Sequence, residues 1–206
     1  MLLWAGVFFI VLGFCCLAID RRAAHALYDK ESARFENFLE ATTHWAKAGH
    51  WLIAAVVALA LAQAGLLVGI ESDALHAASR YAWAFIVCLA VGSAILHSMK
   101  LVVGRRRPRD DMEMGKYEFV WFKFRTDYNS FPSGHALTIM TVAAIASCVW
   151  PQLAVLWFAV ALWLGVTRAL LTAHFFSDVF IGAGIGLLAT RETLLYFFPS
   201  LPPHWF

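Results

Sequence analysis

Long apolar runs separated by short polar segments dominate the pattern of this chain. A helix that crosses the hydrocarbon core of a bilayer needs about 20 consecutive apolar residues. Six runs reach or approach this length, although the fourth is short and ends at Trp150-Pro151, which predicts a tight turn. The first run lacks a basic segment before it, so it is interpreted as a span and not as a signal peptide. The pattern predicts spanning helices at about Leu2–Ile19, Trp51–Ile70, Tyr81–Met99, Ala136–Trp150, Leu153–Leu171 and Val179–Phe198.

Two polar segments interrupt these runs. In residues 20–50, apolar side chains recur at helical spacing among charged ones, which predicts an amphipathic helix at the membrane surface, with a solvated helical hairpin as the alternative. The second segment, residues 104–131, is basic and rich in aromatic residues, and forms either a short hairpin or an interfacial loop. The predicted fold is therefore all-α: a polytopic membrane protein with six transmembrane helices and an interfacial amphipathic helix, in a single domain over residues 1–206.

Composition supports the membrane interpretation. Hydrophobic residues make up 61% of the 206 residues and charged residues 15%, against about 45–50% and about 25% in a typical soluble domain. The formal net charge of +2 gives no reason to expect a nucleic acid partner. The four cysteines lie inside apolar runs without metal-ligand spacing, so they are interpreted as small buried side chains. Neither a metal site nor a cofactor is predicted.

Charged residues at the ends of the predicted spans are candidates for function, because a charge in the hydrocarbon core is costly. Six spans place three connections on one side of the membrane: residues 20–50, 100–131 and 173–177. The stretch KLVVGRRRP opens the second of these connections. If the third helix continues to Pro108, Lys100 and Arg107 lie two turns apart on one face, where two cations suit a phosphate. A basic cluster that binds lipid headgroups is the alternative.

The tetrapeptide Pro132-Ser133-Gly134-His135 stands where the fourth predicted helix begins. The first amide groups of a helix lack intrahelical partners and, together with the helix dipole, favour an anion. Gly134 lets an anion approach the backbone closely, Ser133 adds a hydroxyl, and His135 projects from the first turn. An ordinary Pro-Ser cap with an incidental histidine is the alternative.

The third candidate is the stretch TRALLTAHFFSD, which leads into the sixth predicted span. His174 and Asp178 are four residues apart, which predicts that they stack on one helical face. A carboxylate hydrogen-bonded to one imidazole nitrogen leaves the other nitrogen free to attack. Arg168 supplies a further set of donors for phosphate oxygens. The alternative is a buried Arg–Asp pair that stabilises the bundle, with His174 a bystander.

Together the three clusters bring three cations, one anion-binding helix terminus, two histidines and one carboxylate to the same side of the membrane. This combination predicts a phosphoryl-transfer site that works without a metal. The clusters resemble, in order, the three signature motifs of the type 2 phosphatidic acid phosphatase superfamily: Lys100-x6-Arg107-Pro108, Pro132-Ser133-Gly134-His135 and Arg168-x5-His174-x3-Asp178. The family usually has Ser before the arginine of the third motif, where this chain has Thr167, which keeps the hydroxyl.

This resemblance implies a bacterial membrane lipid phosphatase in which His174 attacks phosphorus to form a phosphohistidine and is oriented by Asp178. His135 would protonate the leaving oxygen and then activate water, so a bell-shaped pH–rate profile is expected. The implied substrates are phosphatidylglycerol phosphate, phosphatidic acid, undecaprenyl diphosphate and the 1-phosphate of lipid A. The phosphate oxygens would be held by Lys100, Arg107, Ser133, Gly134 and Arg168.

Two arguments disagree on the side of the membrane at which the site lies. Fourteen of the 16 Lys and Arg residues fall on the motif side, which by the positive-inside rule indicates the cytoplasm. The family resemblance implies a bacterial inner membrane with the site in the periplasm, and this interpretation is adopted. A phosphotransferase that passes the phosphoryl group to a second lipid, and a non-enzymatic transporter of anionic lipids, are the alternative functions. The sequence leaves the oligomeric state open.

Overall fold

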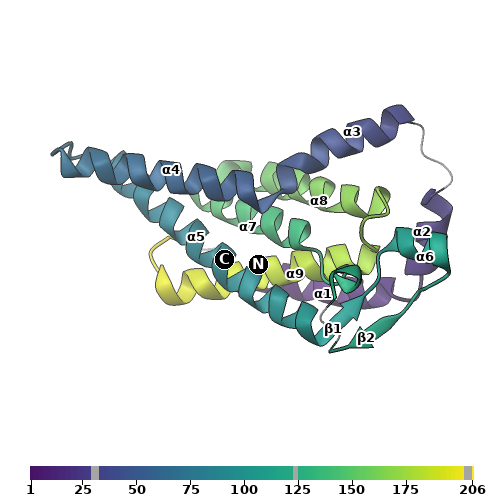
Figure 1. Ribbon diagram of the computed structural model, residues 1–206. Coiled ribbons are helices and arrows are strands. Elements are labelled where there is room, and N and C mark those ends of the chain that lie inside the picture. The colour runs from purple at the N-terminus through teal and green to yellow at the C-terminus, as the bar shows by residue number, and fades with distance from the viewer. Residues whose placement is uncertain (29–32, 123–124, 202–205) are drawn as a thin grey trace.

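The structure is a computed structural model that describes residues 1–28, 33–122, 125–201 and 206, and helices make up most of it (Figure 1). The helices are α1 (Leu2–Cys16), α2 (Asp20–Tyr28), α3 (Ala33–Thr43), α4 (Ala48–Leu67), α5 (Asp73–Val102), α6 (Pro108–Met114), α7 (Gly134–Val149), α8 (Ala154–Leu170) and α9 (Phe176–Phe197). Short 3-10 helices lie at His44–Ala46 (η1), Thr126–Tyr128 (η2) and Pro151–Leu153 (η3). Two strands, β1 (Val103–Arg105) and β2 (Phe119–Trp121), pair in antiparallel orientation.

The core of the bundle lies where α7 and α9 pack against each other and against α1, α5 and α8. Nearly every residue of α7 is buried, from Ala136 to Cys148. Helix α9 presents glycines to this contact, and a side-chain carbon added at Gly186 would lie 2.6 Å from the backbone oxygen of Leu137. Small residues allow two helix backbones to approach closely. The contact therefore holds the first turn of α7 against the middle of α9.

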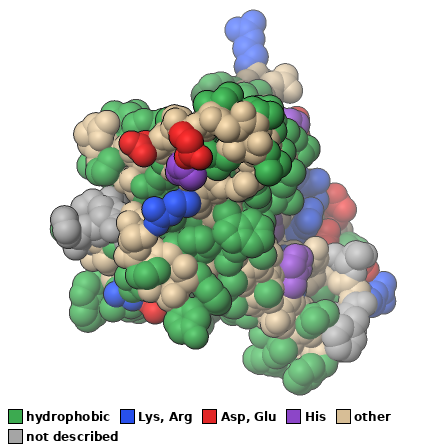
Figure 2. All heavy atoms as spheres, turned by 90° about the vertical axis from the view of Figure 1, so that its left-hand side faces the viewer, with side chains coloured by type: hydrophobic (Ala, Val, Ile, Leu, Met, Phe, Trp, Pro, Cys, Tyr) green, Lys and Arg blue, Asp and Glu red, His purple; other side chains and the backbone are tan. Residues whose placement is uncertain are grey.

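Apolar side chains cover much of the outer surface. Trp4 on α1, Leu67 on α4 and Val155 on α8 are 73%, 86% and 85% exposed. Figure 2 shows apolar side chains over much of the face that contains the connection between α4 and α5. A helix that is apolar on its exposed sides fits a lipid environment. The outer surface thus agrees with the membrane interpretation.

All six predicted apolar helices are present, as α1, α4, α5, α7, α8 and α9. Four helical stretches of the described residues are long and apolar enough to cross a membrane by themselves: Ala33–Leu67, Asp73–Val102, Pro151–Leu170 and Phe176–Phe197. Helix α1 qualifies only together with α2, across a bend of 76°, and α7 is a shorter apolar helix. By length and composition the structure therefore supports four spans, or five with the bent pair, where the sequence predicts six.

Both polar segments contain regular secondary structure. Residues 20–50 form two helices, α2 and α3, in place of one amphipathic helix, and residues 29–32 between them lie outside the described residues. Helix α3 packs against α8, with the ring centres of Phe38 and Trp163 6.4 Å apart. In residues 104–131 the hairpin alternative is correct, because β1 pairs with β2 and α6 lies between them. The fold is thus mostly helical and not purely so.

The three motif segments meet at one end of the bundle. Helix α5 ends there and leads into β1, while α7 and α9 both begin there (Figure 1). The backbone N–H of Ser133, just before α7, donates to the backbone oxygen of Asp178 in the first turn of α9 over 2.9 Å. This hydrogen bond joins the second motif to the third.

Candidate active site

A cavity of about 310 Å³ lies where the motif segments meet. Its walls come from α5, α7, α8, the segment in which η1 leads into α4, and three residues between elements, Arg107, Asn129 and His174. Six of the eight predicted site residues line the cavity: Lys100, Arg107, Gly134, His135, Arg168 and His174. The other two, Ser133 and Asp178, are fully buried, and Asp178 contacts the lining residue His174.

Lys100 and Arg107 reach the cavity without sharing a helical face. The condition for a shared face, a third helix that continues to Pro108, is not met, because α5 ends at Val102 and the chain continues as β1. Gly104 in this strand packs so closely that an added side-chain carbon would lie 3.0 Å from two neighbouring side chains. Lys100 Nζ donates to the backbone oxygen of Asn129 over 2.7 Å, which holds the ammonium group at the cavity wall.

The start of α7 has the form expected for an anion-binding helix terminus. Ser133 occupies the N-cap position, but its side chain makes no capping hydrogen bond. Its Oγ is buried and has no hydrogen-bond partner among the described residues. A side-chain carbon at Gly134 would meet no atom within 4 Å, so the space beside this backbone is open. A buried polar atom without a partner is costly, and a phosphate oxygen in the cavity would supply that partner.

His174 lies in the loop before α9, so it does not stack with Asp178 on one helical face as predicted. Helix α9 begins at Phe176, where Oδ2 of Asp178 caps it by accepting the backbone N–H of Phe175 over 2.9 Å. Nδ1 of His174 lies 2.8 Å from the backbone oxygen of Ser130 and 3.8 Å from Oδ2 of Asp178. The two residues do meet, but the hydrogen bond of His174 goes to Ser130.

This hydrogen bond fixes the tautomer of His174. A carbonyl oxygen only accepts hydrogen bonds, so Nδ1 carries the hydrogen and Nε2 keeps its lone pair. Burial lowers the pKa of His174 from its ordinary value, against the opposing attraction of the Asp178 carboxylate. The ring is therefore neutral near pH 7, and His174 is one of the residues that line the cavity.

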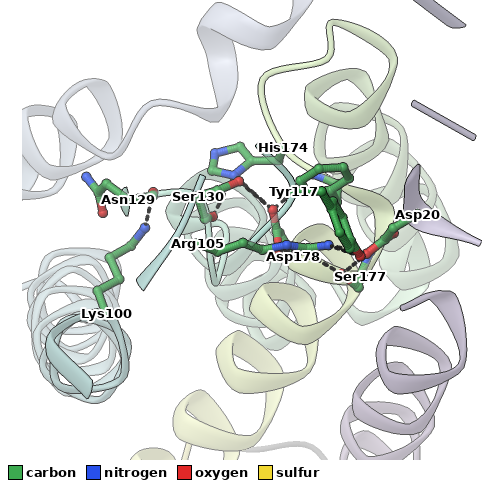
Figure 3. A network of polar contacts seen from close by, with 10 residues as sticks. Asp20, Lys100, Arg105, Tyr117, Asn129, Ser130, His174, Ser177 and Asp178 are labelled. Carbon is green, nitrogen blue, oxygen red and sulfur yellow. Dashed lines mark hydrogen bonds and ion pairs between the residues drawn. The ribbon is translucent and has the colours of Figure 1, made fainter. Parts of the chain in front are cut away.

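Behind His174, a buried network of polar side chains fixes Asp178 (Figure 3). Oγ of Ser130 donates to Oδ2 of Asp178 over 2.6 Å, and Nη1 of Arg105 donates to Oδ1 over 2.6 Å. Neither Ser130 nor Arg105 belongs to the predicted site. Ser130 is a single hydroxyl outside the Pro-Ser-Gly-His motif, and Arg105 is the first of three consecutive arginines. Neither position carries a chemical signature that a single sequence reveals.

Arg168 and Lys47 add to the positive charge around the cavity. Nε of Arg168, near the end of α8, is buried without a hydrogen-bond partner in the described part of the chain. Lys47, just before α4, lines the cavity beside the three motif cations, with its Nζ 3.1 Å from Nδ1 of His44. The sequence pattern places Lys47 in the interfacial segment and gives it no role. Four cations around an open helix terminus fit an anionic ligand. Three histidines of the described residues line the same cavity, His97, His135 and His174, and histidine is a residue type that serves acid–base and nucleophilic chemistry.

Comparison with protein families and curated proteins agrees with this geometry. The family model described as the PAP2 superfamily matches residues 81–201, which contain all three motifs. Two curated relatives are both named lipid A 1-phosphatase. The protein from Rhizobium johnstonii is 33% identical over 115 residues, which cover 55% of this chain and 47% of that protein. The protein from Rhizobium etli is 35% identical over 104 residues, which cover 50% and 45%. The match thus spans about half the length of each curated relative.

Two solved structures share the fold. The crystal structure of LpxE from Aquifex aeolicus superposes with a TM-score of 0.61 at 18% identity, covering 86% of this chain and 96% of that one. The transmembrane PAP2 type phosphatidylglycerolphosphate phosphatase from Bacillus subtilis has a TM-score of 0.60 at 16% identity, covering 97% and 96%. At this identity the similarity establishes the fold, and the motif residues carry the rest of the argument.

Proposed function

Because the chain belongs to the PAP2 superfamily, we propose that it is a lipid phosphatase, which hydrolyses the phosphate group of a phosphorylated membrane lipid. The observation that carries this proposal is the cavity in which the motif cations, the open start of α7, His135 and His174 meet. A site that only binds anions has no need of an imidazole held as one neutral tautomer. The apolar helices would keep the acyl chains of the lipid in the bilayer while its phosphate enters the cavity.

The first candidate substrate is the 1-phosphate of lipid A. Both curated relatives are lipid A 1-phosphatases by name. The solved structure from Bacillus subtilis is a phosphatidylglycerolphosphate phosphatase, which makes phosphatidylglycerol phosphate the second candidate. Phosphatidic acid and undecaprenyl diphosphate present the same phosphate group on a lipid anchor and complete the set.

The proposed chemistry has two steps. Nε2 of His174 attacks phosphorus in line with the leaving oxygen, and the P–O bond breaks as His135 donates a proton to that oxygen. In the second step His135 takes a proton from water, the water oxygen attacks phosphorus, and the P–N bond breaks to release phosphate. The donors that would stabilise the charge of both transition states are the side chains of Lys100, Arg107, Arg168 and Ser133 and the backbone N–H of Gly134.

Phosphate release from purified lipids tests this function directly. The protein in detergent is expected to release inorganic phosphate from at least one of the four lipids, at an equal rate with and without a chelator. A phosphotransferase would move the phosphoryl group to a second lipid, and a transporter would bind the lipid without releasing phosphate. Loss of activity on chelation would contradict the proposed metal-independent mechanism.

A bell-shaped pH–rate profile is expected, because His174 must be neutral to attack while His135 must be protonated to donate. The acid limb belongs to His174. Burial lowers the pKa of His174, so its neutral fraction falls only as the pH drops below the ordinary histidine value of about 6.5. Initial rates of phosphate release should therefore fall on the acid side below this pH. A rate that is flat from acid to alkaline pH would contradict the pairing of the two histidines.

We further propose that all six apolar helices lie in the membrane, with α2 and α3 at its surface and the cavity on the periplasmic side of a bacterial inner membrane. Helix α7 is short, yet longer helices enclose it, so it need not match the bilayer thickness alone. An impermeant thiol reagent applied to intact cells should label a cysteine introduced at the exposed residue Lys116. Labelling only after cell lysis would place the cavity in the cytoplasm.

A further inference from the structure

Arg105 is a cation that protein encloses almost completely. Its side chain is 1% exposed, and its two terminal nitrogens contact carboxylates from distant parts of the chain. Nη1 donates to Oδ1 of Asp178 over 2.6 Å, and Nη2 donates to Oδ2 of Asp20 over 2.8 Å. Nη1 also donates to Oγ of Ser177, and Nη2 to the hydroxyl of Tyr117. Figure 3 shows the guanidinium group between the two carboxylates.

Aromatic rings separate this ion network from water. The guanidinium carbon of Arg105 lies 3.8 Å from the ring centre of Phe175 and 4.5 Å from that of Phe119. Arg105 and Asp20 are not among the described residues that line the cavity. In such a dry surrounding their charges act on neighbouring groups with little screening.

The backbone and the side chain of Arg105 both support the residue that holds His174. The backbone oxygen of Arg105 accepts the N–H of Ser130 over 3.0 Å. The side chain of Arg105 holds Asp178, which accepts the hydroxyl hydrogen of Ser130. The backbone oxygen of Ser130 in turn accepts the hydrogen on Nδ1 of His174. The orientation of the proposed nucleophile thus depends on groups that Arg105 fixes.

We propose that Arg105 and Asp20 are positioning residues, which hold Asp178 and Ser130 and thereby set both the orientation of His174 and the charge behind it. This proposal rests on the proposed function, because it gives a role to groups around the proposed nucleophile. It extends the functional site beyond the three motifs to the start of α2. Asp20 also binds the N–H of Ser177 over 3.1 Å, so it ties α2 to the first turn of α9.

The net charge of the network predicts the direction in which the pKa of His174 changes when one of its charges is removed. One cation faces two carboxylates, so the network behind His174 is negative. Removal of the Arg105 charge makes it more negative, which favours the protonated ring and raises the pKa of His174. Removal of the Asp20 charge makes it neutral, which favours the neutral ring and lowers that pKa. The charged or titratable groups of other elements and loops that line the same cavity as the ring are Lys47, His97, Lys100, Arg107, His135 and Arg168.

The experiment compares Arg105→Gln, Asp20→Asn and Arg105→Lys with the wild type by phosphate release from the best lipid substrate as a function of pH. Arg105→Gln should lower kcat about tenfold while KM changes less than about twofold, and should move the acid limb about half a pH unit higher. Asp20→Asn should move the acid limb lower by a similar amount. Arg105→Lys keeps the charge without the fork of donors, so it should restore the acid limb and only part of kcat.

Arg106→Gln is the matched control. Arg106 follows Arg105 directly, yet its guanidinium carbon lies 4.6 Å from the ring centre of Tyr128 and its Nε 3.4 Å from Glu118, outside the network. This variant should keep the wild-type kcat and pH profile.

Equal or absent shifts of the acid limb in Arg105→Gln and Asp20→Asn would overturn the inference while leaving the phosphatase function intact. If Arg105→Gln does not fold, Asp20→Asn decides alone, and an acid limb that stays in place or moves to higher pH refutes the proposal. A wild-type protein that releases phosphate from none of the four lipids is a different result, because it removes the proposed function and the inference with it.

Discussion

Replacement of His174 by glutamine is expected to lower phosphate release by about 10⁴-fold or more, because it removes the nucleophile of the first step. Glutamine has a similar size, and its amide group is able to donate to the backbone oxygen of Ser130, which now accepts from Nδ1 of the ring. The support behind the side chain therefore survives. An amide nitrogen has no lone pair free for attack, so the covalent step is lost while the cations that hold the phosphate remain.

The measurement is phosphate release from the best lipid substrate, together with binding of the same lipid by the inactive variant. Binding should persist, since the cavity keeps its cations. His76→Gln is the matched control, because His76 lies at the start of α5 in an exposed pair with Glu71. Turnover that survives in His174→Gln would contradict the phosphohistidine and would favour a binding or transport role for the cavity.

The apolar pattern locates the helices well, because burial in lipid or in the core demands apolar side chains on every side of a span. The six runs and the six helices agree within a few residues at most ends. The number of spans is less accessible from the same pattern. Helix α7 has 16 residues and relies on the helices around it, and α1 bends sharply into α2. Neither the enclosure of a short helix nor a bend between two helices leaves a trace in hydropathy.

The motif residues are accessible from the sequence because chemistry restricts which residue types suit a phosphate. Their supports are not accessible, as the three consecutive arginines show. Arg107 lines the cavity, Arg106 lies over Tyr128, and Arg105 is buried between two carboxylates. The direction of each side chain depends on where α5 ends, at Val102, and on where the short strand that follows it ends, at Arg105. A residue spacing alone does not contain that information.

The same limit explains the error at His174. A spacing of four suggests one helical face, but the chain turns at Thr172, whose φ of 48° lies in the left-handed region. Asp178 then caps α9 from inside its first turn. The two residues therefore meet across a helix terminus, and Ser130 takes the hydrogen bond that the spacing assigns to Asp178.

The contact between α7 and α9 gives the second large expected effect. A side-chain carbon at Gly182 would lie 2.3 Å from the backbone oxygen of Ser133 and 3.1 Å from its backbone nitrogen. That oxygen accepts the first hydrogen bond of α7, from Leu137, and that nitrogen donates to the backbone oxygen of Asp178. Since a normal carbon contact needs roughly 3.5 Å, the start of α7 must move about 1 Å away from α9. The anion-binding terminus and the segment that carries His135 move with it.

Gly182→Ala is therefore expected to lower kcat/KM by about 100-fold, the usual cost of a 1 Å displacement of reacting groups, and to lower the free energy of unfolding by about 1–3 kcal/mol. Phosphate release and thermal unfolding in detergent measure the two effects. Gly165→Ala is the matched control, because a side-chain carbon there meets its nearest neighbour at an ordinary 3.5 Å, and it should keep both values near the wild type. Wild-type turnover in Gly182→Ala would show that the site does not depend on the close seating of α7 on α9. Glycine is thus required at Gly182 because the backbone oxygen of Ser133 occupies the space that a methyl group would need.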